Sequence, residues 1–157
     1  MKRFPIALAM LCCIAVSACS SGPVRRVSEP TANIQQLTVR ADGSWSVDLR
    51  IENFSSIPMR FDSIALALTV GGEAAGTLQA QPALSIGPEA ADIATMTLQP
   101  SPQARIAIAD ALARSRSIGY TLDGTLSAAP EKAGVRTFKL KRDNGLNPVP
   151  GLAGVLR

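Results

Sequence analysis

Histidine is absent from the 157-residue sequence, and this absence excludes many catalytic and metal-binding arrangements. Without an imidazole, the chain cannot build a Ser-His-Asp triad, a histidine metal ligand or a histidine acid or base. The acidic residues are scattered singly, and no calcium loop, glycine-rich phosphate loop or GxSxG motif is present. We therefore expect a non-enzymatic protein with no catalytic residue, cofactor or metal site. Only carboxylates that converge in the fold would revive an enzymatic hypothesis.

Cysteine is also scarce, and its three positions all lie close to the N-terminus. Lys2 and Arg3 precede an apolar stretch, residues 4–16, that is too short to span a bilayer, as is typical of a secretory signal. The stretch contains Cys12 and Cys13, and its last residue begins the motif VSAC at residues 16–19. Small residues followed directly by cysteine resemble a bacterial lipobox.

The lipobox resemblance implies that residues 1–18 form a cleaved lipoprotein signal peptide and that Cys19 carries a diacylglycerol thioether and an N-acyl chain. Several acyl chains hold a protein stably on a membrane, and they would also remove the last free thiol. The residue after the lipidated cysteine is Ser20, which, unlike an aspartate, permits transfer to the outer membrane. The resemblance therefore implies an address on the inner leaflet of the outer membrane, facing the periplasm. Two alternatives stay open: an ordinary secretory signal cut beside an incidental cysteine, and an N-terminal anchor that is never cut.

Strong net charge is lacking as well. Removing residues 1–18 leaves 139 residues, enough for one domain, with a net charge of about +2 that predicts no nucleic-acid partner. A local basic cluster stands near the C-terminus: Arg136, Lys139, Lys141 and Arg142. It is interpreted either as a solvated strand face or as a contact for lipid phosphates.

Alternating apolar residues predict short strands along most of the chain. Residues 19–32, with two prolines, predict a lipidated tether. Trp45 begins the clearest alternation, in residues 44–53, which indicates one buried and one solvated sheet face. A strand is also expected over residues 59–70, where a change of parity between Phe61 and Ile64 predicts a bulge or bend near residues 62–63. Further strands are expected over residues 34–40, 74–81, 94–98, 118–126 and 138–140, with a short segment at 84–86.

One helix is predicted over residues 102–115, with Ser101 as its cap and a buried face of Ile106, Ala109, Leu112 and Ala113. We expect an all-β fold of about seven strands and one short helix, an immunoglobulin or fibronectin III-like β-sandwich over residues 33–142. The Gly/Pro-rich apolar tail, residues 143–157, is either flexible or docked over a sandwich edge, or else it binds a partner or touches a membrane.

Four runs of sequence resemble a known domain: VDLRIEN at 47–53, IPMRF at 57–61, IALALTVGG at 64–72 and AGTL at 75–78. They are similar to the water-stress and hypersensitive-response (WHy) domain of late-embryogenesis-abundant (LEA) type 2 proteins, across residues 33–142. Phe54 departs from the pattern, because many members have proline there. The resemblance implies a stress-associated β-sandwich without established catalytic residues.

Two residues invite a functional interpretation. Asn53 matches the family asparagine, and it either pairs backbone groups at the strand end or contacts a ligand. Trp45 belongs to the core or stacks on a ligand. The leading hypothesis is a non-enzymatic envelope lipoprotein, held to the membrane by its lipid, that protects or binds clients under desiccation stress. The alternative is an accessory subunit of an envelope transport or assembly machine, so the expected partners are the membrane and protein clients or envelope proteins.

Overall fold

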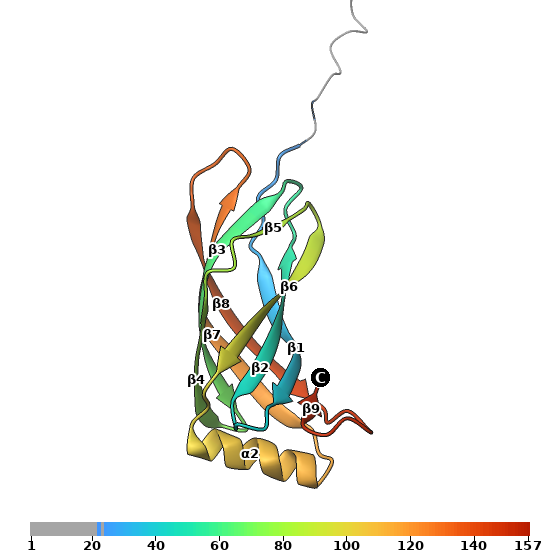
Figure 1. The fold of residues 1–157 in the computed structure, drawn as a ribbon. Helices are drawn as coiled ribbons and strands as arrows, with labels where there is room; N and C mark the ends of the chain where they lie inside the picture. The colour runs from blue at the N-terminus through green and yellow to red at the C-terminus, as the bar shows by residue number, and fades with distance from the viewer. Residues whose placement is uncertain (1–21, 23) are drawn as a thin grey trace, which may run out of the picture.

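The computed structural model describes residue 22 and residues 24–157, so Cys19, Ser20 and the signal prediction lie outside the described part. The described residues form a β-sandwich of two antiparallel sheets and one helix (Figure 1). In chain order the elements are β1 (Thr31–Val39), β2 (Trp45–Asn53), β3 (Met59–Val70), β4 (Glu73–Ala80), β5 (Leu84–Ile86), β6 (Ala90–Leu98), α2 (Pro102–Ala113), β7 (Ile118–Pro130), β8 (Arg136–Leu146) and β9 (Val155–Leu156).

The two sheets enclose one apolar core. The first sheet has the order β6-β2-β1-β9 and the second β4-β3-β7-β8, with the short β5 paired to β3. The predicted alternation of β2 is confirmed, because Trp45, Val47, Leu49 and Ile51 are each at most 1% exposed. Their neighbours face outward, as a sheet with one buried face requires. The predicted all-β sandwich is therefore observed.

The change of parity in β3 also has its expected cause. The pairing of β3 with β7 shifts register between Phe61 and Ser63, which is a bulge at the predicted place. An extra residue there lets Phe61 and Ile64 both point into the core, where they are 0% and 2% exposed. The bulge thus keeps a long strand buried on one face along its whole length.

The helix begins as predicted, but it buries a different face. The Ser101 hydroxyl accepts a hydrogen bond from the Ala104 amide at 3.2 Å, so the cap is confirmed. The predicted face was wrong for Ile106, which is 69% exposed, and right for Leu112, which is partly buried against the core. The fully buried residues of the helix are Ala104, Ile108 and Ala111. Because α2 lies across one end of the sandwich, only a narrow stripe spaced four and three residues apart meets the core (Figure 1). Small alanines let that stripe approach closely.

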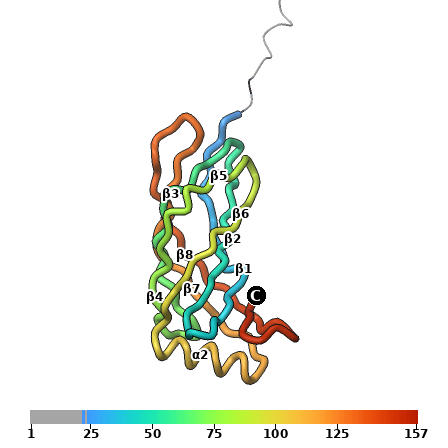
Figure 2. The backbone as a smooth tube through the Cα atoms, viewed as in Figure 1, coloured from blue at the N-terminus to red at the C-terminus, as the bar shows by residue number. Residues whose placement is uncertain are grey.

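The C-terminal tail is docked on the sandwich. Residues as far as Leu146 complete β8, and β9 pairs with β1 through Leu37 with Leu156 and Thr38 with Val155. Leu146 and Leu156 are fully buried, so these apolar tail residues belong to the core. The remaining residues, 147–154, form a loop beside the C-terminal end of α2 (Figure 2). Docking over a sandwich edge is therefore the observed state of the tail.

Candidate functional site

The sandwich has two ends, one closed by loops and the other covered by α2 (Figure 1). The first described residues enter at one end, beside the loops 54–58, 87–89 and 131–135, and we call this the tether end. The opposite end, the helix end, consists of α2, the β1–β2 turn at residues 40–44 and the loop 147–154. Strand β2 joins the two ends, from Trp45 at the helix end to Asn53 at the tether end.

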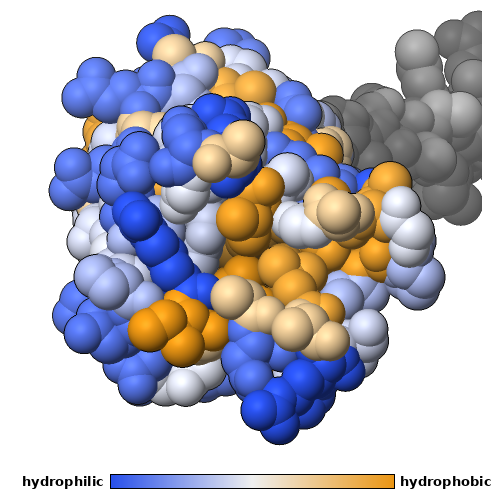
Figure 3. Space-filling view, turned by 60° about the horizontal axis from the view of Figure 1, so that its bottom comes forward, coloured by the Kyte–Doolittle hydropathy of each residue, from blue (hydrophilic) through white to orange (hydrophobic). Residues whose placement is uncertain are grey.

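The helix end is hollowed and apolar. A hollow of about 230 Å³ lies between α2 and the β1–β2 turn, and it is lined by Val39, Gly43, Trp45, Arg105, Ile108, Ala109 and Leu112. A second hollow of about 720 Å³ shares Leu112 and is otherwise lined by Ala113, Ser115 and residues 148–154. Viewed toward this end, hydrophobic side chains surround a depression that polar residues border (Figure 3). Such a surface is suited to an apolar ligand or partner.

Large apolar side chains remain exposed around these hollows. Ile106 is 69% exposed on the outer face of α2, and Leu152 is 50% exposed in the C-terminal loop. Trp45 forms part of a hollow's wall but is only 1% exposed, so its predicted core role is confirmed. The apolar tail was a candidate partner-binding segment. Its residue Leu156 lies in the core, whereas Leu152 lies at the surface.

One positively charged side chain lines the hollows of the helix end. Among the described residues that line the two hollows, Arg105 is the only charged one. Asp110, nearby on α2, accepts from Arg114 Nε at 2.7 Å and from an Arg116 guanidinium nitrogen at 2.8 Å, so its charge is already compensated. Arg105 makes no hydrogen bond or ion pair with another side chain of the described chain. Its guanidinium is therefore available to an anionic group.

The tether end is organised by Asn53. The Asn53 amide nitrogen donates to the carbonyls of Ile57, Ile86 and Gly87 at 2.9, 3.2 and 2.8 Å, and its oxygen accepts from the Ser55 amide at 2.9 Å. Its side chain is buried, with 1% exposure. The prediction that it pairs backbone groups at the strand end is confirmed, because these contacts use both ends of the amide.

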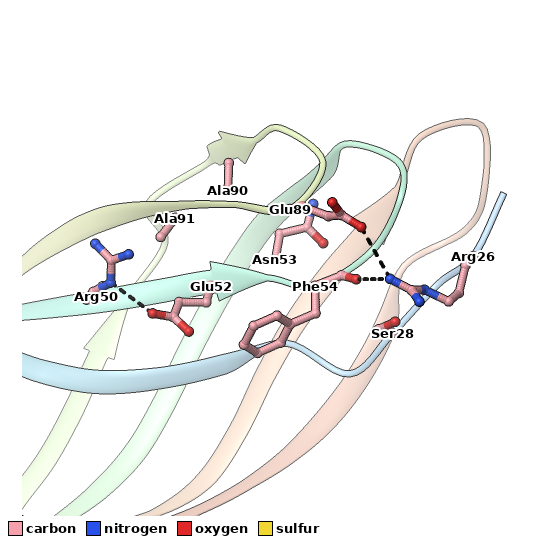
Figure 4. Close-up of a pocket in the computed structure, with 9 residues that line it drawn as sticks. All are labelled: Arg26, Ser28, Arg50, Glu52, Asn53, Phe54, Glu89, Ala90 and Ala91. Atoms are coloured by element: carbon pink, nitrogen blue, oxygen red, sulfur yellow. Dashed lines mark hydrogen bonds and ion pairs between the residues drawn. The ribbon is translucent and has the colours of Figure 1, made fainter. Parts of the chain in front are cut away.

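Polar side chains line a shallow hollow next to Asn53, of about 570 Å³ (Figure 4). Its charges are paired: Arg26 with Glu89 at 3.4 Å, and Arg50 with Glu52 at 2.9 Å. In the described residues there is no group of three or more acidic or cysteine side chains placed to hold a metal ion. The arrangement is that of a neutralised surface, and we assign it no chemistry.

The predicted basic cluster of β8 is divided between two environments. Lys139 and Lys141 lie exposed on the outer face of the strand. Arg142 instead faces the edge of the sandwich, where its Nε donates to the Thr31 hydroxyl at 2.9 Å. Strand alternation accounts for the division, because residues 139 and 141 share a parity that 142 lacks.

No helix of the described chain is long and apolar enough to span a bilayer.

Sequence reasoning missed Arg105 and the loops that hold the tether. Arg105 follows no motif, and its meaning comes only from the hollow that folding creates beside it. Ser55 and Ser56 follow the predicted alternation of residues 44–53, and no role was predicted for them. Their position two and three residues after Asn53, at the end of a predicted strand, was the available signal, since serine often binds backbone groups at turns.

The fold class is a two-sheet β-sandwich, and comparisons with known proteins find this fold in a solved structure. No protein-family model matches the chain, and no curated protein matches it. A protein from Arabidopsis thaliana, known from a solution structure, is 11% identical, with 88% of this chain and 93% of that chain covered at a TM-score of 0.53. A Bordetella pertussis protein is 15% identical, with 83% of this chain and 100% of that chain covered at a TM-score of 0.49. An Archaeoglobus fulgidus protein is 11% identical, with 79% of this chain and 98% of that chain covered at a TM-score of 0.44. At these identities the Arabidopsis match shows a shared fold and nothing further.

Proposed function

We propose that this protein is a non-enzymatic, lipid-anchored lipoprotein of the bacterial envelope that binds protein clients at its helix end. The observation that carries the proposal is the polarity of the molecule: the first described residues lie at one end, and the apolar hollows lie at the opposite end (Figures 1 and 3). An anchor at Cys19 would leave the helix end facing away from the membrane. That end is where a client in the periplasm can reach it.

The chemistry of the helix end favours one kind of client. Apolar walls formed by Val39, Leu112 and Val149 suit an apolar segment of a partially unfolded or amphipathic protein. The unpaired guanidinium of Arg105 suits an acidic side chain beside that segment, because charge complementarity steers and orients a partner. A client with an apolar stretch flanked by aspartate or glutamate therefore fits this surface.

The finer family assignment belongs to the same proposal. The WHy-like runs at residues 47–53 and 57–61 cover most of β2 and the start of β3, with a loop between them, which is the strand, loop and strand order that the resemblance implies. An immunoglobulin or fibronectin III-like sandwich of the LEA type 2 kind is consistent with two packed antiparallel sheets. A client-protecting role in desiccation follows from that family, and an outer-membrane address follows from Ser20 after the lipidated Cys19.

A drying experiment tests the client-binding role. A desiccation-sensitive dehydrogenase is dried and rehydrated with the chain, with an equal mass of an inert protein, or alone, and the recovered activity is measured. We expect greater recovery with the chain, and a loss of that advantage in Leu152→Asp and Arg105→Glu. Equal recovery with the chain and with the inert protein would contradict the protective role.

A matched control separates the helix end from general surface effects. Ile93 lies on β6, away from the hollows, and is 40% exposed, similar to Leu152 at 50%. Ile93→Asp should protect as well as the wild type. If Ile93→Asp and Leu152→Asp lose protection equally, the helix end is not the client surface.

The anchor has its own test: Cys19→Ser should abolish incorporation of labelled palmitate, and continued labelling would refute the lipidation.

A further inference from the structure

The segment that leads into the sandwich is fastened to the tether end. The amide of Arg26 donates to the Ser56 hydroxyl at 2.8 Å, the Ser56 amide donates to the Arg26 carbonyl at 3.0 Å, and the Ser56 hydroxyl donates to the Val24 carbonyl at 2.7 Å. The Ser28 amide donates to the Ser55 hydroxyl at 2.9 Å. From Val24 onward, therefore, the chain belongs to the folded domain and adds nothing to the length of a tether.

Arginine side chains reinforce this attachment on two sides. A guanidinium nitrogen of Arg26 donates to the Phe54 carbonyl at 3.2 Å and lies 3.4 Å from Glu89 (Figure 4). Arg25 donates to the Glu131 carbonyl at 2.8 Å, in the turn between β7 and β8. The segment thus bridges the loops that close the tether end.

The attachment sets how far the domain can stand from a membrane. Five residue steps separate Cys19 from Val24, and at roughly 3.6 Å per step they span at most about 18 Å. The sequence predicted a tether of residues 19–32, whose stretched length would be more than twice as great. With the lipid of Cys19 in the bilayer, the loops of the tether end lie within reach of its headgroups.

The loops at this end carry side chains suited to such a surface. Three large apolar residues are exposed there: Val24 at 80%, Phe54 at 47% and Val135 at 64%. Lys132 and Arg136 stand in and beside the β7–β8 turn, next to Val135. Aromatic and aliphatic side chains enter the interface of a bilayer favourably, and neighbouring cations contact lipid phosphates.

We infer that the tether end is a membrane-seating surface, on which Val24, Phe54 and Val135 rest among the headgroups of a phospholipid leaflet. The inference rests on the lipid anchor of the proposed function. Strand β2, with nine residues, holds the helix end roughly 30 Å farther from the bilayer than the tether end. The molecule is thereby oriented, with the client surface directed away from the lipid.

The single tryptophan of the chain makes this orientation measurable. Trp45 is buried at the helix end and serves as a common background. Two variants each add a second tryptophan at a half-exposed apolar site: Phe54→Trp at the tether end and Leu152→Trp at the helix end. The proteins are extracted from membranes with their own anchor and reconstituted into vesicles of phosphatidylethanolamine and phosphatidylglycerol that contain a brominated phospholipid, which quenches nearby tryptophan.

We expect Phe54→Trp to lose fluorescence and shift its emission to shorter wavelength in brominated vesicles, while Leu152→Trp and the wild type lose none. Quenching of both variants to the same extent, or of neither, would overturn the inference. Palmitate labelling is read separately, so failure of the natural anchor is distinguishable. In that case the chain of residues 19–157 is coupled through the Cys19 thiol to a maleimide phospholipid, and the same comparison tests the seating alone.

Discussion

The tether end and the helix end of this sandwich are closed by different interactions. At the tether end, loops are joined by hydrogen bonds that converge on Asn53, Ser55 and Ser56. At the helix end, α2 buries two alanines and one isoleucine and leaves apolar hollows beside it. Hydrogen-bonded closure fixes the path of the chain, whereas loose apolar closure leaves surface that another protein can cover. The contrast supports the proposal that clients bind at the helix end, while hydrogen bonds hold the loops of the tether end in place.

Asn53→Ala should produce the largest effect, at the tether end. The change removes the partner of three carbonyls and of the Ser55 amide, in a site that is 1% exposed. Because buried polar groups without partners are costly, we expect a loss of about 3–5 kcal/mol in the free energy of unfolding. Urea titration measures it. Asn144→Ala, at an exposed position of β8, is the control, and a loss no larger than the control's would show that Asn53 does not organise this end.

Ile108→Ala should have a smaller effect, because the helix end is already incompletely packed. Truncating a buried isoleucine costs about 2–5 kcal/mol, and we expect the lower half of this range, since Ile108 borders a hollow and loses fewer contacts. Ile106→Ala, on the same helix but 69% exposed, should change stability by less than about 0.5 kcal/mol. Equal losses for the two variants would contradict the observed burial of α2.

The smallest effect concerns the β1–β2 turn and depends on pH. The Ser44 hydroxyl and amide donate to the Asp42 carboxylate at 2.6 and 2.9 Å, and these hydrogen bonds hold the pKa of Asp42 below its ordinary value. A lowered pKa means that the folded state favours the charged form, so its contribution is present at neutral pH and disappears as the pH falls through the folded pKa.

Asp42→Asn should therefore lower the melting temperature slightly at pH 7, and the difference from the wild type should narrow below about pH 4. Differential scanning fluorimetry across this range measures both. Asp143→Asn, on the exposed part of β8, serves as the control. A difference that is the same at pH 7 and pH 3 would show that the carboxylate charge does not support the turn.

The sequence was sufficient for features that depend on local pattern. The alternation from Trp45 to Ile51, the bulge after Phe61 and the Ser101 cap follow from side-chain periodicity and backbone hydrogen bonding, and all three are observed. The buried face of α2 was not predictable in this way. Apolar residues occur around much of the helix, and the position of the sandwich selects Ile108 over Ile106.

The candidate site depended even more on contacts distant in sequence. The hollows form where α2, the turn at residues 40–44 and the loop 147–154 meet, and no motif marks that meeting. Likewise, the attachment of Arg26 to Ser56 joins residues 30 positions apart, so composition alone indicated a free tether. The apolar character of the tail was visible, but its division into buried Leu156 and exposed Leu152 required the pairing of β9 with β1.

The central claim is that one end faces the membrane and the other faces a client, and one measurement in living cells tests it directly. A photoreactive benzoylphenylalanine is placed at residue 54 or at residue 152, and the adducts formed on irradiation are separated by mass. The account predicts a discrete protein adduct from residue 152 that is lost with Arg105→Glu, and a lipid adduct without a protein adduct from residue 54. A protein adduct from residue 54 with none from residue 152 would contradict it.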